Sequence, residues 1–127
     1  MDIPKGLFYN REHFWVKRED DLARCGITDF AQQELGDVVF VELPKVGVKV
    51  KRGDRIGDVE SIKTVSNLYA PVAGEVVEVN TELDSTPEFI NQDPYGKGWI
   101  CAIKPDMEED FSELMSEADY HLHIKEE

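Results

Sequence analysis

Apolar and polar positions alternate in short runs along the first third of the chain, a pattern typical of β-strands. We predict a strand over residues 13–17, a turn at 19–21 and a returning strand over 22–27. A continuous run of strand-forming apolar residues over 38–41, stopped by Pro44, predicts a further strand. This part of the chain therefore favours a β protein built from short strands.

One short helix is predicted between these strands. Thr28 or Asp29 is suited to cap it, because the side-chain oxygen of either residue accepts from the free N–H groups of the first turn. The helix continues through Leu35, and Gly36 is suited to end it in a left-handed conformation.

A weak repeat occupies the middle of the chain. Its two copies have the same spacing of three and consist of Gly47, Val50, Gly53 and Ile56, then Gly74, Val77, Asn80 and Leu83. Gly53 and Asn80 both tolerate a positive φ, as a tight turn needs. The copies flank Lys63, which predicts a quasi-symmetric β unit with this lysine at its midpoint.

The last part of the chain changes from strand to helix. We predict a single helical turn over 85–90, with Pro87 at its first helical position, and a final strand over 99–103. After Pro105, apolar residues recur at helical spacing and predict an amphipathic helix docked on the β core. These residues are Met107, Phe111, Leu114 and Met115. A second short helix is predicted from Ser116 toward Ile124.

Length and charge limit the number of domains and the class of ligand. The 127 residues suit a single domain spanning 1–127, and a hydrophobic content of 41% is enough for a core. A formal net charge of −13 argues against nucleic acid as a ligand. We interpret the charge first as a source of solubility and second as a means of steering the protein toward basic partners. We expect no membrane span and a cytoplasmic location, since no apolar run or leader pattern is present. We also expect a monomer.

Catalytic chemistry is sparse in this sequence. Cys25 and Cys101 form no CxxC pair, and we predict buried unreactive thiols; a disulfide between them would require neighbouring strands, which the sequence leaves open. His13 is interpreted as structural, while His121 and His123 are interpreted as solvated. We predict no catalytic residue and no metal site, so the chain is interpreted as a carrier or binding module.

One lysine stands apart because of its place between two strand-like runs. Lys63 lies between residues 55–59 and 68–72, at the expected tip of a hairpin. Its ordinary interpretation, from spacing alone, is an exposed surface lysine.

The residues around Lys63 resemble a known modification site. Glu60-Ser61-Ile62-Lys63, followed by residues 70–80, resembles the lipoylation site of the H protein of the glycine cleavage system. Ile62 and Thr64 differ from the methionines that flank the lysine of biotin carriers. The resemblance extends over nearly the whole chain, at residues 13–15, 26–29, 31–32, 35–41, 43–44, 90–91, 94–95 and 98–99.

The resemblance implies both a fold and a function. The fold would be an all-β barrel-sandwich hybrid with short peripheral helices and a C-terminal helix. Lys63 would carry lipoate in amide linkage, and Glu60 and Ser61 would be recognised by the lipoate-attaching enzyme. The arm would take an aminomethyl group from glycine decarboxylase (P protein), pass it to the aminomethyltransferase (T protein) and be reoxidised by dihydrolipoamide dehydrogenase (L protein). The protein itself would not be an enzyme.

Three positions depart from the family pattern and leave open which chemical group the lipoyl arm carries. Phe14 replaces a glutamate that in the family helps to hold the charged aminomethyl group, and nearby Glu12 is a candidate to compensate. Asn67 replaces a common aspartate, and Thr64 replaces a small residue. Glu12, Phe14 and Asn67 are therefore the candidate arm contacts. One alternative is an H-like lipoate-binding paralogue in sulfur oxidation or lipoate relay, and another is an unmodified interaction domain.

Overall fold

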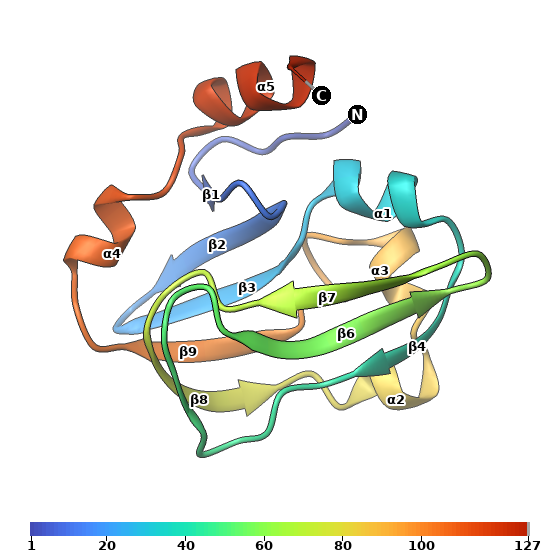
Figure 1. Ribbon diagram of the computed structural model, residues 1–127, viewed down its shortest axis with the longest axis horizontal. Coiled ribbons are helices and arrows are strands. Elements are labelled where there is room, and N and C mark those ends of the chain that lie inside the picture. Colours follow the sequence, from blue (N-terminus) through green and yellow to red (C-terminus); the bar gives the residue numbers. More distant parts are fainter. Residues whose placement is uncertain (127) are drawn as a thin grey trace.

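Two antiparallel β-sheets form the body of the protein, with short helices around them (Figure 1). The computed structural model describes residues 1–126. The larger sheet has the strand order β1-β2-β3-β9-β8-β5, and the smaller has the order β4-β6-β7. The strands are β1 Phe8–Tyr9, β2 Phe14–Glu19, β3 Leu22–Ile27, β4 Val38–Glu42, β5 Lys49–Val50, β6 Arg55–Ser61, β7 Val65–Tyr69, β8 Gly74–Val79 and β9 Cys101–Pro105. The helices are α1 Asp29–Leu35, α2 Glu82–Ser85, α3 Phe89–Gln92, α4 Glu109–Ser112 and α5 Glu117–Lys125.

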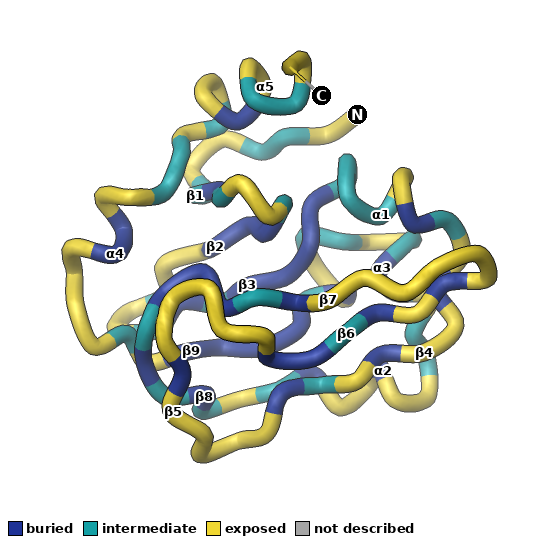
Figure 2. Tube along the Cα trace, viewed as in Figure 1, coloured by how far each residue is buried: buried dark blue, intermediate teal, exposed yellow. Residues whose placement is uncertain are grey.

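The main core combines apolar side chains from both sheets. Val16 and Ile103 of the larger sheet belong to the same buried cluster as Val59 and Leu68 of the smaller one. Figure 2 shows buried stretches along β2, β3 and β9, and an exposed turn between β6 and β7. Burial of one face of each sheet follows from the alternation of side chains along a strand. A second, smaller cluster contains Tyr9, Trp15 and Tyr120.

The first helix forms as its local signals predict. The Thr28 hydroxyl accepts from the backbone N–H of Ala31 at 3.2 Å and caps α1. Gly36 ends the helix with φ 78° and ψ −159°. This ψ lies outside the left-handed helical region that the sequence predicted, in a region open almost only to glycine.

The hairpin of β2 and β3 is longer than predicted. Glu19 pairs with Leu22, so only Asp20 and Asp21 form the turn, and β2 extends to Glu19. Asp20 has φ 54°, which aspartate tolerates better than most residues.

Asn80 corrects the prediction made from the repeat. Among the residues that the structure describes, only His13 and Asp20 combine a side chain with a positive φ, so Asn80 is not a turn residue of that kind. Its buried amide instead donates to the backbone carbonyls of Lys97 and Trp99, each at 2.8 Å. The repeat still has a structural counterpart, because β5 of the first copy pairs antiparallel with β8 of the second.

The helical turn predicted over 85–90 is divided into two helices. Leu83 in α2 and Ile90 in α3 are both fully buried, and the chain forms a separate turn around each of them. Pro87 lies between the two helices rather than at the first position of either.

The amphipathic helix predicted after Pro105 is much shorter than its pattern. Only α4, Glu109–Ser112, forms before the backbone of Met115 pairs with that of Tyr9. That extended pairing ends the helix. The second predicted helix forms as α5, capped by the hydroxyl of Ser116.

Candidate functional site: the Lys63 turn and its cavity

A serine hydroxyl organises the turn that carries Lys63. Ser61 is buried, and its Oγ accepts from the N–H groups of Lys63 at 3.3 Å and Thr64 at 3.1 Å. The same hydroxyl donates to the Thr64 carbonyl at 3.2 Å. The backbone N–H of Ser61 also donates to that carbonyl at 2.8 Å. Ser61, a candidate for enzyme recognition, therefore also fixes the local shape of the turn.

The turn is held a second time by the segment that links α1 to β4. The backbone N–H of Ile62 donates to the carbonyl of Asp37 at 3.0 Å. A Cβ atom added to Gly36 would lie 3.3 Å from Lys63 Cε. The absence of a side chain at Gly36 therefore gives the aliphatic stem of Lys63 room to lie against α1.

Several apolar side chains close to Lys63 in the sequence or in the sheet are exposed to solvent. Glu60 is exposed and is paired with Phe40 on one side and Val65 on the other, so the three share the outer face of the smaller sheet. We define the outer patch as Val39, Phe40, Ile62 and Val65, whose side chains are between 49% and 71% exposed. Four large apolar residues around one lysine are typical of a contact surface.

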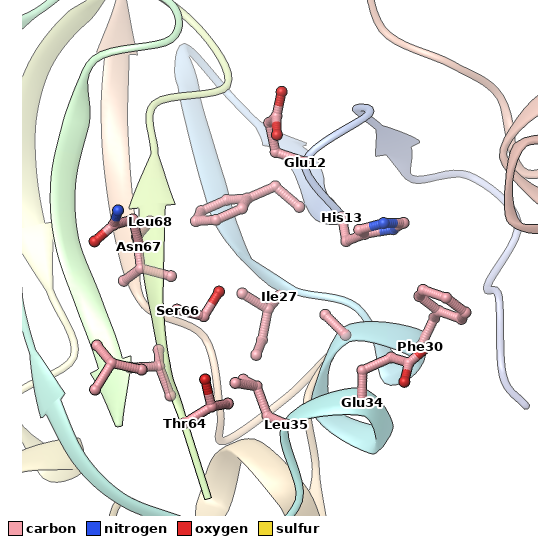
Figure 3. Close-up of a pocket in the computed structure, with 14 residues that line it drawn as sticks. Glu12, His13, Ile27, Phe30, Glu34, Leu35, Thr64, Ser66, Asn67 and Leu68 are labelled. Atoms are coloured by element: carbon pink, nitrogen blue, oxygen red, sulfur yellow. The ribbon is translucent and has the colours of Figure 1, made fainter. Parts of the chain in front are cut away.

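A cavity of about 410 Å³ lies between α1 and β7, next to the turn (Figure 3). Its walls include apolar residues and the hydroxyl-bearing Thr64 and Ser66. The residues that line it are Glu12, His13, Phe14, Ile27, Phe30, Ala31, Glu34, Leu35, Val59, Thr64, Val65, Ser66, Asn67 and Leu68. A cavity of this size and character suits a largely apolar chain with a small polar end.

The three candidate arm contacts all line this cavity but differ in what they offer. Phe14 is only 1% exposed and forms an apolar wall. The carboxylate of Glu12 points away from the cavity centre in Figure 3. Asn67 Oδ1 accepts from Arg55 Nε and its Nδ2 donates to the Tyr69 hydroxyl, both at 3.3 Å. Figure 3 places its amide on the side of β7 away from Ser66.

Tyr120 of α5 supports one end of the cavity and was missed by the sequence analysis. Its hydroxyl lies 2.8 Å from His13 Nδ1 and 2.7 Å from Thr28 Oγ1. Burial is the first cause that raises the pKa of Tyr9, the ring stacked on Tyr120 at 4.7 Å. These contacts agree with the structural role predicted for His13. No sequence signal singled out Tyr120, because its partners lie far away along the chain.

The two cysteines lie opposite each other on neighbouring strands. Cys25 of β3 pairs with Cys101 of β9, and both are free thiols with no exposed surface. Their sulfur atoms are 3.5 Å apart. The contact with the Cys101 thiol, followed by burial, raises the pKa of Cys25 well above its ordinary value. Both thiols are therefore buried, as predicted, and Cys25 is a weaker acid than an ordinary cysteine.

Among residues 1–126, no helix combines the length and the apolar character that crossing a bilayer requires.

The sequence model of the family described as "Glycine cleavage H-protein" matches residues 7–127 of this chain. The chain belongs to the glycine cleavage H-protein family. The resemblance noted in the sequence is thereby confirmed over nearly the whole chain.

Individual relatives agree with the family assignment. The chain is 56% identical to the glycine cleavage system H protein of Acinetobacter baumannii, over 98% of this chain and all of that protein. It is 53% identical to the H protein of Thermus thermophilus, over 100% of this chain and 99% of that one.

A solved H-protein structure has the same fold. The crystal structure of the H protein from Mycobacterium marinum matches with a TM-score of 0.90 and 40% identity, over 97% of this chain and 99% of that one. The expected barrel-sandwich hybrid, the lipoyl-domain-like fold of H proteins, is confirmed.

Proposed function

We propose that this protein carries lipoate in amide linkage on Lys63 and serves the glycine cleavage system as a non-catalytic carrier. The observation that supports this most directly is the exposed Lys63 on a twice-anchored turn, beside a cavity that suits an apolar arm. Bound lipoate would supply a long flexible arm that ends in a dithiol and takes up the aminomethyl group. The protein contributes attachment, presentation and shelter, and a tethered arm reaches each partner at high effective concentration.

The proposed partners are the glycine decarboxylase, the aminomethyltransferase, the dihydrolipoamide dehydrogenase and the lipoate-attaching enzyme. A formal charge of −13 favours encounter with basic surfaces on these enzymes. Glu60 and Ser61 are proposed as recognition elements for the attaching enzyme: Glu60 as an exposed charge between apolar neighbours, Ser61 through the shape of the turn. We propose a cytoplasmic monomer.

The cavity between α1 and β7 is the proposed resting place of the arm. Phe14 supplies apolar surface there. Glu12 is the proposed carboxylate partner of the cargo amine, after a rotation of its exposed side chain toward the cavity. We propose that Asn67 contacts the arm only at the rim of the cavity, because its amide is hydrogen-bonded to Arg55 and Tyr69.

The alternative paralogue function receives less support. The relatives described above are named as glycine cleavage system H proteins, which favours glycine over sulfur as the source of the cargo. The replacements at Phe14 and Asn67 remain the observation in favour of the paralogue.

The first experiment tests attachment. Wild type, Lys63→Ala and the control Lys97→Ala are incubated with a lipoate-attaching enzyme, lipoate and ATP, and their intact masses are measured. We expect the mass increase of one lipoyl group in wild type and in the control, and none in Lys63→Ala. Modification of the Lys63→Ala variant would refute the assignment of the site.

The second experiment tests the pathway. Lipoylated protein is mixed with glycine decarboxylase, glycine and labelled bicarbonate, with an established H protein in a parallel reaction. We expect label to enter the carboxyl group of glycine in both reactions. Label in the parallel reaction alone would favour the paralogue function.

A further inference from the structure

The side chain of Asn91 joins α3 to the segment that links α1 to β4. Its Nδ2 donates to the Gly36 carbonyl at 2.8 Å and to Gln32 Oε1 at 3.0 Å. Its Oδ1 accepts from the backbone N–H of Val38 at 2.9 Å. One amide group thus satisfies a carbonyl at the end of the helix and an N–H at the start of the strand. Ile90, the preceding residue, is fully buried and anchors α3 in the core.

The segment that Asn91 holds is also the segment that holds the Lys63 turn. Residue 37 lies between the two backbone groups bonded to Asn91, and its carbonyl accepts from Ile62 N–H at 3.0 Å. Val38 pairs with Ser61, and the Cα of Gly36 faces the stem of Lys63. A continuous set of contacts therefore runs from Asn91 through residues 36–38 to Lys63.

We infer that Asn91 is a positioning residue for the modification of Lys63. This inference rests on the proposed function, because it takes Lys63 as the attachment site. Lysine has a flexible four-carbon stem, so the position of its amine depends on how firmly the backbone of the turn is held. Amide formation requires that the amine meet the activated lipoyl carbonyl within the enzyme, and misplacement of a reacting group lowers the rate strongly.

Loss of the Asn91 amide would act on the turn through residue 37. The Gly36 carbonyl and the Val38 N–H would both lose their side-chain partner, so the segment between them would move more freely. The Ile62–Asp37 hydrogen bond would then open more often. Lys63 would spend less time in the geometry that the attaching enzyme uses.

Asn80 provides a matched control within the same chain. Its amide also donates to two backbone carbonyls, each at 2.8 Å, and its side chain is buried. Its partners are Lys97 and Trp99, which make none of the contacts described above with the Lys63 turn. Asn80→Ala therefore reports the general cost of removing a structural asparagine.

The test compares Asn91→Ala and Asn80→Ala with wild type in two measurements. The first is kcat/KM for lipoate attachment, measured well below the melting temperature of each variant. The second is hydrogen exchange of the Ile62 amide, measured by NMR. We expect attachment to Asn91→Ala to fall by about tenfold and Ile62 exchange to accelerate by a similar factor. Asn80→Ala should stay within about twofold of wild type in both measurements, whatever its loss of stability.

Asn91→Asp is the second variant and keeps the shape of the side chain. A carboxylate still accepts from Val38 N–H but cannot donate to Gly36 or Gln32. We expect the same two changes as in Asn91→Ala, so the test stands if the alanine variant does not fold.

Four outcomes distinguish the inference from the function on which it rests. The positioning role would be overturned if the Asn91 variants were lipoylated with the wild-type kcat/KM, or if Asn80→Ala lost as much kcat/KM as they do. Hydrogen exchange of the Ile62 amide at the wild-type rate in the Asn91 variants would also overturn it. If wild type itself is not lipoylated, the proposed function fails, and the exchange measurement still decides whether Asn91 holds the turn.

Discussion

The two sides of strand β7 offer contrasting surfaces. On the inner side, Ser66 and Leu68 face a cavity with apolar walls (Figure 3). On the outer side, the patch near Lys63 is exposed, and beyond it Arg55 bonds Asp58 at 2.7 Å and Glu42 at 3.3 Å. Alternation along one strand separates the two surfaces. We propose that the inner side holds the flexible lipoyl arm and that the outer side meets the attaching enzyme.

Two phenylalanines should show the largest difference between these sides. Phe14 lines the inner cavity and is 1% exposed, whereas Phe40 on the outer face is 54% exposed. We expect Phe14→Ala to lower the free energy of unfolding by about 3–5 kcal/mol. Phe40→Ala should change it by less than about 0.5 kcal/mol. Urea denaturation of both variants measures this, and similar losses would contradict the contrast.

Filling the cavity should expose the loaded arm. Ser66→Phe adds an aromatic ring on the inner side of β7 at an exposed strand position, where aromatic residues are favoured. We expect the aminomethyl group to leave the loaded protein about tenfold faster, because the arm then remains in water.

Release of ammonia from loaded protein measures this rate. Glu42→Phe, which adds the same ring to the exposed outer face, is the control and should leave the rate unchanged. Unchanged release from Ser66→Phe would mean that the cavity does not shelter the arm.

Trimming the outer patch should have a smaller effect, which we expect in lipoate attachment. Val65→Ala removes apolar surface beside Lys63, and we expect kcat/KM for lipoate attachment to fall by about threefold. Val46 is exposed to a similar extent, 60% against 57%, but lies outside the patch. Val46→Ala should therefore be lipoylated with the wild-type kcat/KM. Attachment kinetics measured in parallel on the two variants test this difference.

The smallest effect, on stability against acid, should come from Asp29. This residue is the first of α1, the helix that forms one wall of the cavity. Burial alone would raise the pKa of Asp29, but hydrogen bonds from the Asp2 N–H and from Gln32 outweigh it and lower that pKa below 3.8. A lowered folded-state pKa stabilises the protein above the ordinary value, and this stability is lost as pH falls through the folded value.

Asp29→Asn should therefore weaken the acid dependence of unfolding by less than about 1 kcal/mol. Urea titrations near neutral pH and below pH 3.8 compare the two proteins. A steeper acid dependence in Asp29→Asn would reverse the sign and contradict the prediction.

Features with local causes could be predicted from the sequence. Thr28 and Gly36 bound α1 because a cap and a glycine act within one helical turn. The turn at Lys63 was predicted from the two runs beside it and then from its resemblance to H proteins.

Features with distant causes could not be predicted. The pairing of Met115 with Tyr9 shortens the helix after Pro105, and those residues are far apart in the chain. The amide of Asn80 donates to a carbonyl nearly twenty residues away. The rule that asparagine tolerates a positive φ in a turn therefore predicted the wrong backbone conformation there. Glu12 and Asn67 were named from a pattern, but the direction of each side chain depends on neighbours that only the folded chain brings together.

The sealed position of Cys25 and Cys101 has a consequence for electron flow. These are the two cysteines of the sequence, and both have no exposed surface. Thiol–disulfide exchange needs an accessible thiolate, and burial denies that access to both cysteines, while the raised pKa of Cys25 further disfavours its thiolate. We therefore expect no disulfide exchange between these cysteines and the proposed lipoyl dithiol, so reoxidation of that dithiol would require another molecule.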